Sequence, residues 1–245
     1  MFWSQMRIAA AVMALCAVGA GLVVNVDRAA RQGQDLAAVL ANYFSLFTIV
    51  SSSLGAAVLV AAAVWDMRNR GDSREPVAIA LALAAVSGPI LLLGVVYNVL
   101  LRGIPSAVAL GDTAGIAMLD EFAIEVLHVV LPLYVLFDLL AAPRRRGLSW
   151  RMLPVIVGYP LTWTVYTMVR GERVANPDGT TPWWYPYPFL DPHGAGGYGT
   201  ALTYIGGILI AFLAIGSGII AIGRYRERRA TRRHTATPMI GAAPA

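Results

Sequence analysis

A histidine and two acidic residues share one helical face inside an apolar stretch of this sequence. Residues 120–140 read DEFAIEVLHVVLPLYVLFDLL, in which Glu121, Glu125 and His128 follow one another at intervals of four and three residues. This spacing places the three side chains on the same side of a helix. Ionisable groups inside apolar helices are costly and usually face a protein interior. The pattern therefore predicts a buried polar site around His128.

Pro132 lies four residues after His128 and changes the backbone of this site. Because proline has no N–H, the His128 carbonyl loses its helical partner, and the helix is expected to bend there. Three roles for His128 remain open: a structural hydrogen bond to a neighbouring helix, a base, or a metal ligand together with Glu125. Glu125 either orients the imidazole or, like Glu121, is solvated among lipid headgroups.

A metal is the weakest of these roles. The Glu-x-x-His pattern occurs twice in carboxylate-bridged helix bundles. Here it occurs once, and the other two histidines, His193 and His234, lie in a loop and in the tail. We therefore predict no metal and no cofactor.

A second candidate is a face of hydroxyl and small residues near the start of another apolar stretch, NYFSLFTIVSSSLG. Ser45, Thr48, Ser52 and Gly55 recur at steps of three and four residues and share a helical face. Such faces commonly allow membrane helices to pack closely. The alternative is a hydroxyl nucleophile, which needs a base beside it. Thr48 and His128 form the pair that would satisfy this requirement.

Composition assigns the chain to the membrane class. Of its 245 residues, 58% are hydrophobic and 13% are charged, which departs from soluble globular proteins in both respects. The net charge of +5 comes from arginines between apolar spans and does not favour nucleic acid as a partner. Cys16 is the single cysteine, so no disulfide forms within the chain.

Six apolar spans are long enough to cross a bilayer, which requires about 20 residues each. We predict an all-α polytopic membrane protein with a transmembrane domain over residues 1–225 and an arginine-rich, disordered tail over residues 226–245. The predicted spans are 7–26, 42–65, 76–100, 116–140, 152–170 and 199–224.

Arginine is distributed unequally between the two sides of these spans. Fourteen of the 19 basic residues, all of them arginines, lie before the first span, after the second and fourth, and in the tail. Short loops rich in arginine stay in the cytoplasm. Both termini are therefore predicted to be cytoplasmic in a multi-pass protein of the cell membrane, and Thr48 and His128 both fall in the outer half of the bilayer.

Two further groups of polar residues lie at the predicted outer side. Tyr97 and Asn98 end the third span and are either helix-end residues or hydrogen-bond donors to a substrate carbonyl. The longest loop contains PWWYPYPFLDPHG, with Tyr185 and Tyr187 between prolines. Trp and Tyr favour the membrane interface, so this loop is either an aromatic belt or a stiff lid over the bundle.

Several of these segments, taken in order, resemble the bacterial Pr6Pr membrane proteins, which are related to the FAR-17a/androgen-induced-gene-1-like family. The resemblance covers roughly residues 5–225 and rests on order and spacing rather than on one diagnostic motif. The segments that carry it are Phe47-Thr48, Val96-Tyr97-Asn98, Leu127-His128 with Pro132, and the YPYPFLD run of residues 185–191.

The resemblance implies a membrane threonine hydrolase that cleaves fatty acid esters of hydroxy fatty acids. By that similarity Thr48 matches the nucleophile and His128 its paired histidine, and the partners are membrane lipids and an amphiphilic lipid ester. Ser52 stands where the bacterial pattern often has Asn, which is a departure from the pattern. The rival expectation is a non-catalytic lipid-binding or scaffold protein in which Thr48 and His128 are structural. The sequence does not determine the oligomeric state.

Overall fold

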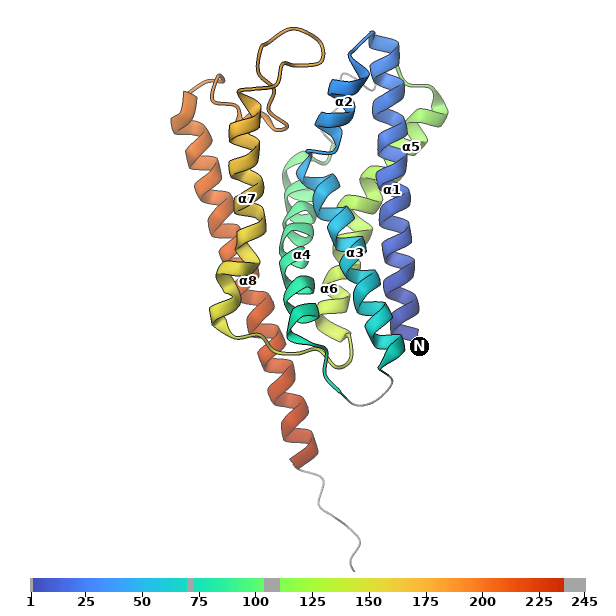
Figure 1. Cartoon of the computed structure of the whole chain (residues 1–245), viewed down its shortest axis with the longest axis vertical. Coiled ribbons are helices and arrows are strands. Elements are labelled where there is room, and N and C mark those ends of the chain that lie inside the picture. Colours follow the sequence, from blue (N-terminus) through green and yellow to red (C-terminus); the bar gives the residue numbers. More distant parts are fainter. Residues whose placement is uncertain (1, 70–72, 104–110, 236–245) are drawn as a thin grey trace, which may run out of the picture.

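Six long helices form the bundle in this computed structural model, which describes residues 2–69, 73–103 and 111–235 (Figure 1). All six are long and apolar enough to cross a membrane, so the all-α, multi-span prediction is confirmed. The N-terminus and the far end of α8 lie at one end of the bundle, called here the terminal end, and the loop between α7 and α8 lies at the other, the loop end. The α-helices are α1 (Phe2–Gln32), α2 (Leu36–Tyr43), α3 (Phe47–Arg68), α4 (Val77–Val96), α5 (Ala114–Glu125), α6 (Leu131–Ala141), α7 (Leu153–Gly171) and α8 (Gly197–Thr235).

Short segments of other helical types interrupt or extend this set. Two are π-helical, η1 (Tyr97–Leu101) after α4 and η3 (Val126–Val130) between α5 and α6. The 3₁₀ turns that lie wholly within the described residues are η4 (Trp150–Met152) before α7 and η5 (Pro188–Leu190) in the loop before α8. π-helical turns are rare and are often found at functional sites, so η1 and η3 are considered again below.

The predicted second span is divided in the structure. α2 ends at Tyr43, a turn follows, and α3 starts at Phe47. Ser45 stabilises the turn because its hydroxyl donates to the Asn42 carbonyl at 2.7 Å, an alternative to helical pairing that serine side chains commonly offer. Thr48 is consequently in the first turn of α3, and not about six residues inside a helix starting at residue 42.

Two helix ends also lie beyond their predicted positions. α1 continues to Gln32 instead of ending near residue 26, and Arg28 in its last turns pairs with Asp112 and Asp120, each at 2.5 Å. α8 continues past residue 224 to Thr235, since alanine and arginine are good helix formers. Of the tail predicted to be disordered, residues 226–235 are therefore helical, and residues 236–245 lie outside the described residues.

α4 is the central helix of the bundle. It packs against α3 on one side, against α6 and η3 on another, and against α7 and α8 on a third. α1 packs closely on α3, where alanines such as Ala14, Ala17 and Ala62 are completely or almost completely buried. Small residues let membrane helices approach one another closely. The arrangement leaves the start of α3 and the segment η3 in contact with the same neighbour, α4.

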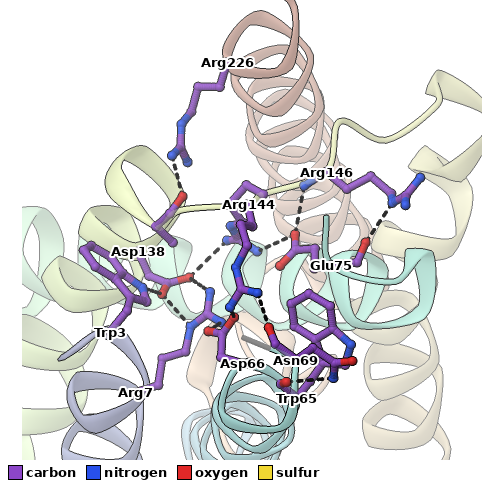
Figure 2. Close-up of polar contacts among 12 residues, drawn as sticks. Trp3, Arg7, Trp65, Asp66, Asn69, Glu75, Asp138, Arg144, Arg146 and Arg226 are labelled. Carbon is purple, nitrogen blue, oxygen red and sulfur yellow. Dashed lines mark hydrogen bonds and ion pairs between the residues drawn. The ribbon is translucent and has the colours of Figure 1, made fainter. Parts of the chain in front are cut away.

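A buried cluster of charges joins four parts of the chain at the terminal end (Figure 2). Arg7 of α1 donates to Asp138 of α6 and to Asp66 of α3, both at 2.8 Å, and Trp3 donates to Asp138 at 2.7 Å. Arg145, in the loop after α6, lies 3.3 Å from Asp138. The cluster fixes the first, second and fourth spans relative to one another.

We predict that Asp138→Asn strongly destabilises the protein. Asp138 is only 2% exposed, and its loss leaves the buried Arg7 and Arg145 without full compensation, a change that typically costs about 3–5 kcal/mol. The matched control is Glu227→Gln, because Glu227 pairs with the exposed Arg74 and such pairs contribute about 0–1 kcal/mol. Thermal unfolding in nanodiscs measures both, and equal melting temperatures would contradict the prediction.

Candidate active site

An apolar cavity of about 210 Å³ lies toward the loop end of the bundle. Several segments contribute to its wall: the start of α3, the end of α4, η1, η3, the middle of α7, η5 and the start of α8. Thr48 and His128, which are 80 residues apart in the sequence, both line it. The polar residues on the wall are Thr48, Tyr97, His128, Trp163, Thr164, Tyr187 and Tyr204.

Thr48 is the second residue of α3, at the N-terminal end of that helix, directly after the buried Phe47. The first N–H groups of a helix have no acceptor within it, and the first backbone bond into α3 runs from Val50 N–H to the Leu46 carbonyl at 3.0 Å. Leu46 precedes the helix and has no side chain that caps it. Thr48 therefore combines a hydroxyl with unpaired backbone donors and the positive end of a helix dipole.

His128 is held in η3 by contacts on both its ring and its backbone. Its Nδ1 lies 3.0 Å from the Ile124 carbonyl. A carbonyl only accepts, so we assign the proton to Nδ1, which leaves Nε2 as the basic nitrogen of the neutral ring. The ring also stacks on Tyr97 of η1, with centroids 4.5 Å apart and an interplanar angle of 30°. In the described part of the chain no group hydrogen-bonds Nε2.

Asn98 provides the missing partner of the His128 carbonyl. Its Nδ2 donates to that carbonyl at 2.9 Å and to the Gly94 carbonyl at 2.8 Å. The expected loss of a helical bond at Pro132 is thereby compensated from a neighbouring helix. The Asn98 amide is fully used in these two bonds and does not line the cavity, so it acts as a helix-to-helix cap and not as a donor to substrate.

Glu125 is paired with Arg102 and not with the imidazole. Arg102 Nη2 donates to Glu125 at 2.9 Å, and Arg102 Nε donates to Asn98 Oδ1, also at 2.9 Å. Both side chains are substantially exposed. Of the two readings of Glu125, this geometry favours the one in which the carboxylate lies in the headgroup zone, and it gives no hydrogen bond by which Glu125 orients His128.

The aromatic loop covers the cavity through one of its two tyrosines. Tyr187 and the η5 residues Phe189 and Leu190 line the cavity, which favours the interpretation of this loop as a lid. Tyr185 lies elsewhere, packed on Gly171, with its hydroxyl donating to Glu172 at 2.7 Å.

Glu172 holds the loop together from outside the cavity. Its carboxylate accepts from Tyr185 and Tyr198 and lies 3.0 Å from His193 Nε2. The Tyr185 hydroxyl, and after it His193, lower the pKa of Glu172 below its usual range. The carboxylate is therefore ionised at neutral pH and joins the end of α7 to the start of α8.

Thr48 and His128 line one cavity but are not hydrogen-bonded to each other. No hydrogen bond joins the two side chains in the described structure, and α3 and η3 each pack against α4. Ser52 is 1% exposed, is absent from the cavity wall, and its hydroxyl has no partner among the described residues. The structure thus brings Thr48, Tyr97, His128 and Tyr187 to one cavity and places Ser52, Asn98, Glu125 and Tyr185 outside it.

Residues of α7 and α8 that line the cavity were not identified from the sequence. Trp163 donates from Nε1 to the Ser45 carbonyl at 2.9 Å and so fixes the turn before α3. Its signal was a tryptophan well inside a span, away from the interface that tryptophan prefers. Phe212 and Tyr204 carried no such signal, because apolar and aromatic residues are common throughout α8. The described residues contain no group of three or more metal-binding side chains.

The comparisons with known proteins return nothing: no family model, no curated protein and no solved structure matches this chain. The resemblance to the Pr6Pr proteins therefore stays a prediction, and the function is argued from the site alone.

We predict that Asn98→Ala destabilises the bundle by about 1–3 kcal/mol, the cost of leaving a backbone carbonyl within a membrane span without its donor. The matched control is Asn69→Ala. Asn69 also ends a helix and donates to the carbonyl four residues earlier, at 2.9 Å, but reaches no second helix. Chemical or thermal unfolding in nanodiscs gives the comparison. Equal losses in the two variants would show that the contact with the His128 carbonyl is unimportant.

Proposed function

We propose that this protein is a membrane-embedded hydrolase of lipid esters, with Thr48 as nucleophile and His128 as base. The observation that carries the proposal is the presence of a hydroxyl and an imidazole, from two different helices, in the wall of one apolar cavity. His128 Nε2 has no hydrogen-bond partner among the described residues, and the Thr48 hydroxyl lies against the phenol of Tyr187, which lines the same cavity. Both groups therefore border the space that a bound molecule would occupy.

The chemistry has two halves. His128 Nε2 takes the proton of the Thr48 hydroxyl as Oγ1 attacks the ester carbonyl, and the protonated imidazole then gives that proton to the departing alcohol. His128 next takes a proton from water, which attacks the carbonyl carbon of the acyl-threonine. The bond to Oγ1 breaks, the acid leaves, and the imidazolium returns its proton to Oγ1. Proton transfer requires Oγ1 and Nε2 to come within hydrogen-bond reach, directly or through one water, and such contacts commonly tighten only when substrate binds.

The cavity suits an acyl chain. Its wall is almost entirely apolar, with leucines of α4, Phe47 and Phe212 around the two polar groups. An ester whose acyl chain fills this space would present its carbonyl to the polar groups on the wall. Fatty acid esters of hydroxy fatty acids, the class implied by the family resemblance, are amphiphilic esters of this kind.

A non-catalytic lipid-binding protein is the second candidate. It is favoured by the absence of a hydrogen bond between Thr48 and His128, since a binding cavity needs no proton transfer. The two candidates differ in whether the hydroxyl of Thr48 becomes acylated.

We predict that the purified protein reacts covalently with a fluorophosphonate probe at Thr48. Thr48→Ala should abolish labelling, and His128→Ala should slow it by about 100- to 10,000-fold, the usual contribution of a general base. Thr164→Ala is the control, because Thr164 also lines the cavity but its hydroxyl donates to the Pro160 carbonyl at 2.9 Å. Hydrolysis of a palmitoyl ester of hydroxystearic acid should follow the same order. A native protein that neither labels nor hydrolyses the ester supports the lipid-binding alternative.

We further propose that both termini are cytoplasmic and that the protein lies in the cell membrane. The start of α1, which contains Arg7, the α3–α4 and α6–α7 connections and the end of α8 share the terminal end of the bundle. These segments carry most of the arginines, as the positive-inside rule requires of a cytoplasmic face. The cavity and its lid then face outward.

This orientation is tested with single cysteines in a Cys16→Ala background. Ala175→Cys in the α7–α8 loop should react with a membrane-impermeant maleimide in intact cells, because that loop is predicted to be outside. Ser73→Cys, also exposed, is its matched control at the terminal end and should react only after permeabilisation. The opposite pattern would reverse the assigned topology.

A further inference from the structure

A buried phenol lies against the Thr48 end of α3 without a hydrogen-bond partner. Tyr187 Oη is inaccessible, and none of the described residues forms a hydrogen bond of normal geometry with it. The polar groups that act on it are the Thr48 hydroxyl and backbone groups of Thr48 and Phe47. A buried hydroxyl that lacks a partner is costly, so its position requires an explanation.

The Tyr187 ring is held firmly in this position. Trp163 packs on it edge-on with centroids 6.0 Å apart, and Phe189 stacks on it at 5.3 Å. Its backbone is extended, and its carbonyl accepts from Leu190 N–H at 2.9 Å. Prolines precede and follow it in the sequence, which restricts the backbone on both sides. The surrounding structure therefore keeps the hydroxyl at the start of α3, against the Thr48 hydroxyl and the backbone of Phe47 and Thr48, and its own proton has no acceptor of normal geometry among the described residues.

The N-terminal end of α3 supplies further hydrogen-bond donors next to Tyr187. The N–H groups of Phe47 and Thr48 precede the first helical backbone bond, which starts at Val50, and the partial positive charge of the helix is largest here. The hydroxyl of Thr164, which also lines the cavity, is not available in this way, because it donates to a carbonyl of its own helix. Donors from a helix end and from a tyrosine thus converge beside the Thr48 hydroxyl.

We propose that Tyr187 Oη and the N–H groups of Phe47 and Thr48 form a site for the carbonyl oxygen of the bound acyl group. The inference rests on the proposed function and adds to it the group that holds the oxyanion. During attack by Thr48, the carbonyl oxygen gains negative charge and accepts from these donors; when the tetrahedral intermediate collapses, the charge returns to the carbonyl. The carboxylate of a fatty acid product is a ligand of the same site.

Burial keeps the phenol protonated, as this role requires. It raises the pKa of Tyr187 above its ordinary value near 10, so the hydroxyl is a donor throughout the physiological range. Tyr97, the other tyrosine near His128, stacks its ring on the imidazole and supports the base instead of the carbonyl.

The test compares Tyr187→Phe with Tyr185→Phe in the full chain in nanodiscs. Tyr185 lies two residues earlier in the same loop, but its hydroxyl donates to Glu172 outside the cavity. Tritiated palmitate binding should weaken about 10- to 100-fold in Tyr187→Phe, the value of a hydrogen bond to a charged group. Fluorophosphonate labelling should slow on the order of 100-fold, the effect of losing one oxyanion donor. Tyr185→Phe should leave both measurements within about twofold of native, since it removes no donor of the site.

Thermal unfolding without ligand provides a third measurement. Because the Tyr187 hydroxyl is buried and unpaired, Tyr187→Phe should match or exceed the melting temperature of the native protein, which also excludes misfolding as the cause of any loss.

The outcomes separate this inference from the proposed function. Labelling that depends on Thr48 but is unchanged in Tyr187→Phe, with palmitate binding also unchanged, would overturn the site and leave the hydrolase. Palmitate binding that depends on Tyr187 in a protein that never labels would support the site and reject the hydrolase. A native protein that binds no palmitate and labels equally with and without the Tyr187 hydroxyl overturns the inference.

Discussion

The hydrogen bond from Asn98 to the His128 carbonyl is the interaction on which the geometry of the site depends. In a bilayer, a backbone carbonyl without a partner is costly because no water is present to satisfy it. Pro132 removes the helical donor of His128, and Asn98 replaces it at 2.9 Å. This replacement of the donor requires α4 and α6 to lie close together. Gly94 permits the approach because it has no side chain: a Cβ at this position would lie 2.7 Å from Pro132 Cβ, which is too close.

Two π-helical segments lie next to this close approach. η1 and η3 lie side by side, and each presents one aromatic ring to the other, Tyr97 and His128. A π-helical turn shifts the face that a side chain occupies relative to an α-helix. The imidazole thus lines the cavity with Nδ1 held by its own helix, and its position is a consequence of backbone requirements met between two helices.

The class of fold was predictable from the sequence, whereas the geometry of the site was only partly so. Length and hydropathy determined the six spans because a bilayer imposes both. Thr48, His128 and Tyr187 were identified from residue type and spacing. The break before α3 was not, because it depends on Ser45 and on Trp163, which is distant in sequence. Likewise, two roles stayed open for Asn98 and for Glu125, because nothing local indicated their bonds to another segment of the chain.

The two ends of the bundle satisfy their polar groups in opposite ways. At the terminal end, all three nitrogens of the Arg7 guanidinium donate to Asp66 or Asp138. At the loop end, the Tyr187 hydroxyl lies against the Thr48 hydroxyl and the first backbone groups of α3, and its proton has no acceptor of normal geometry beside an apolar cavity. Unpaired donors destabilise the free protein, and they become favourable only when a molecule with an acceptor oxygen enters. The buried Tyr187 hydroxyl beside Thr48 and the apolar cavity together are the structural basis of the ligand site proposed above.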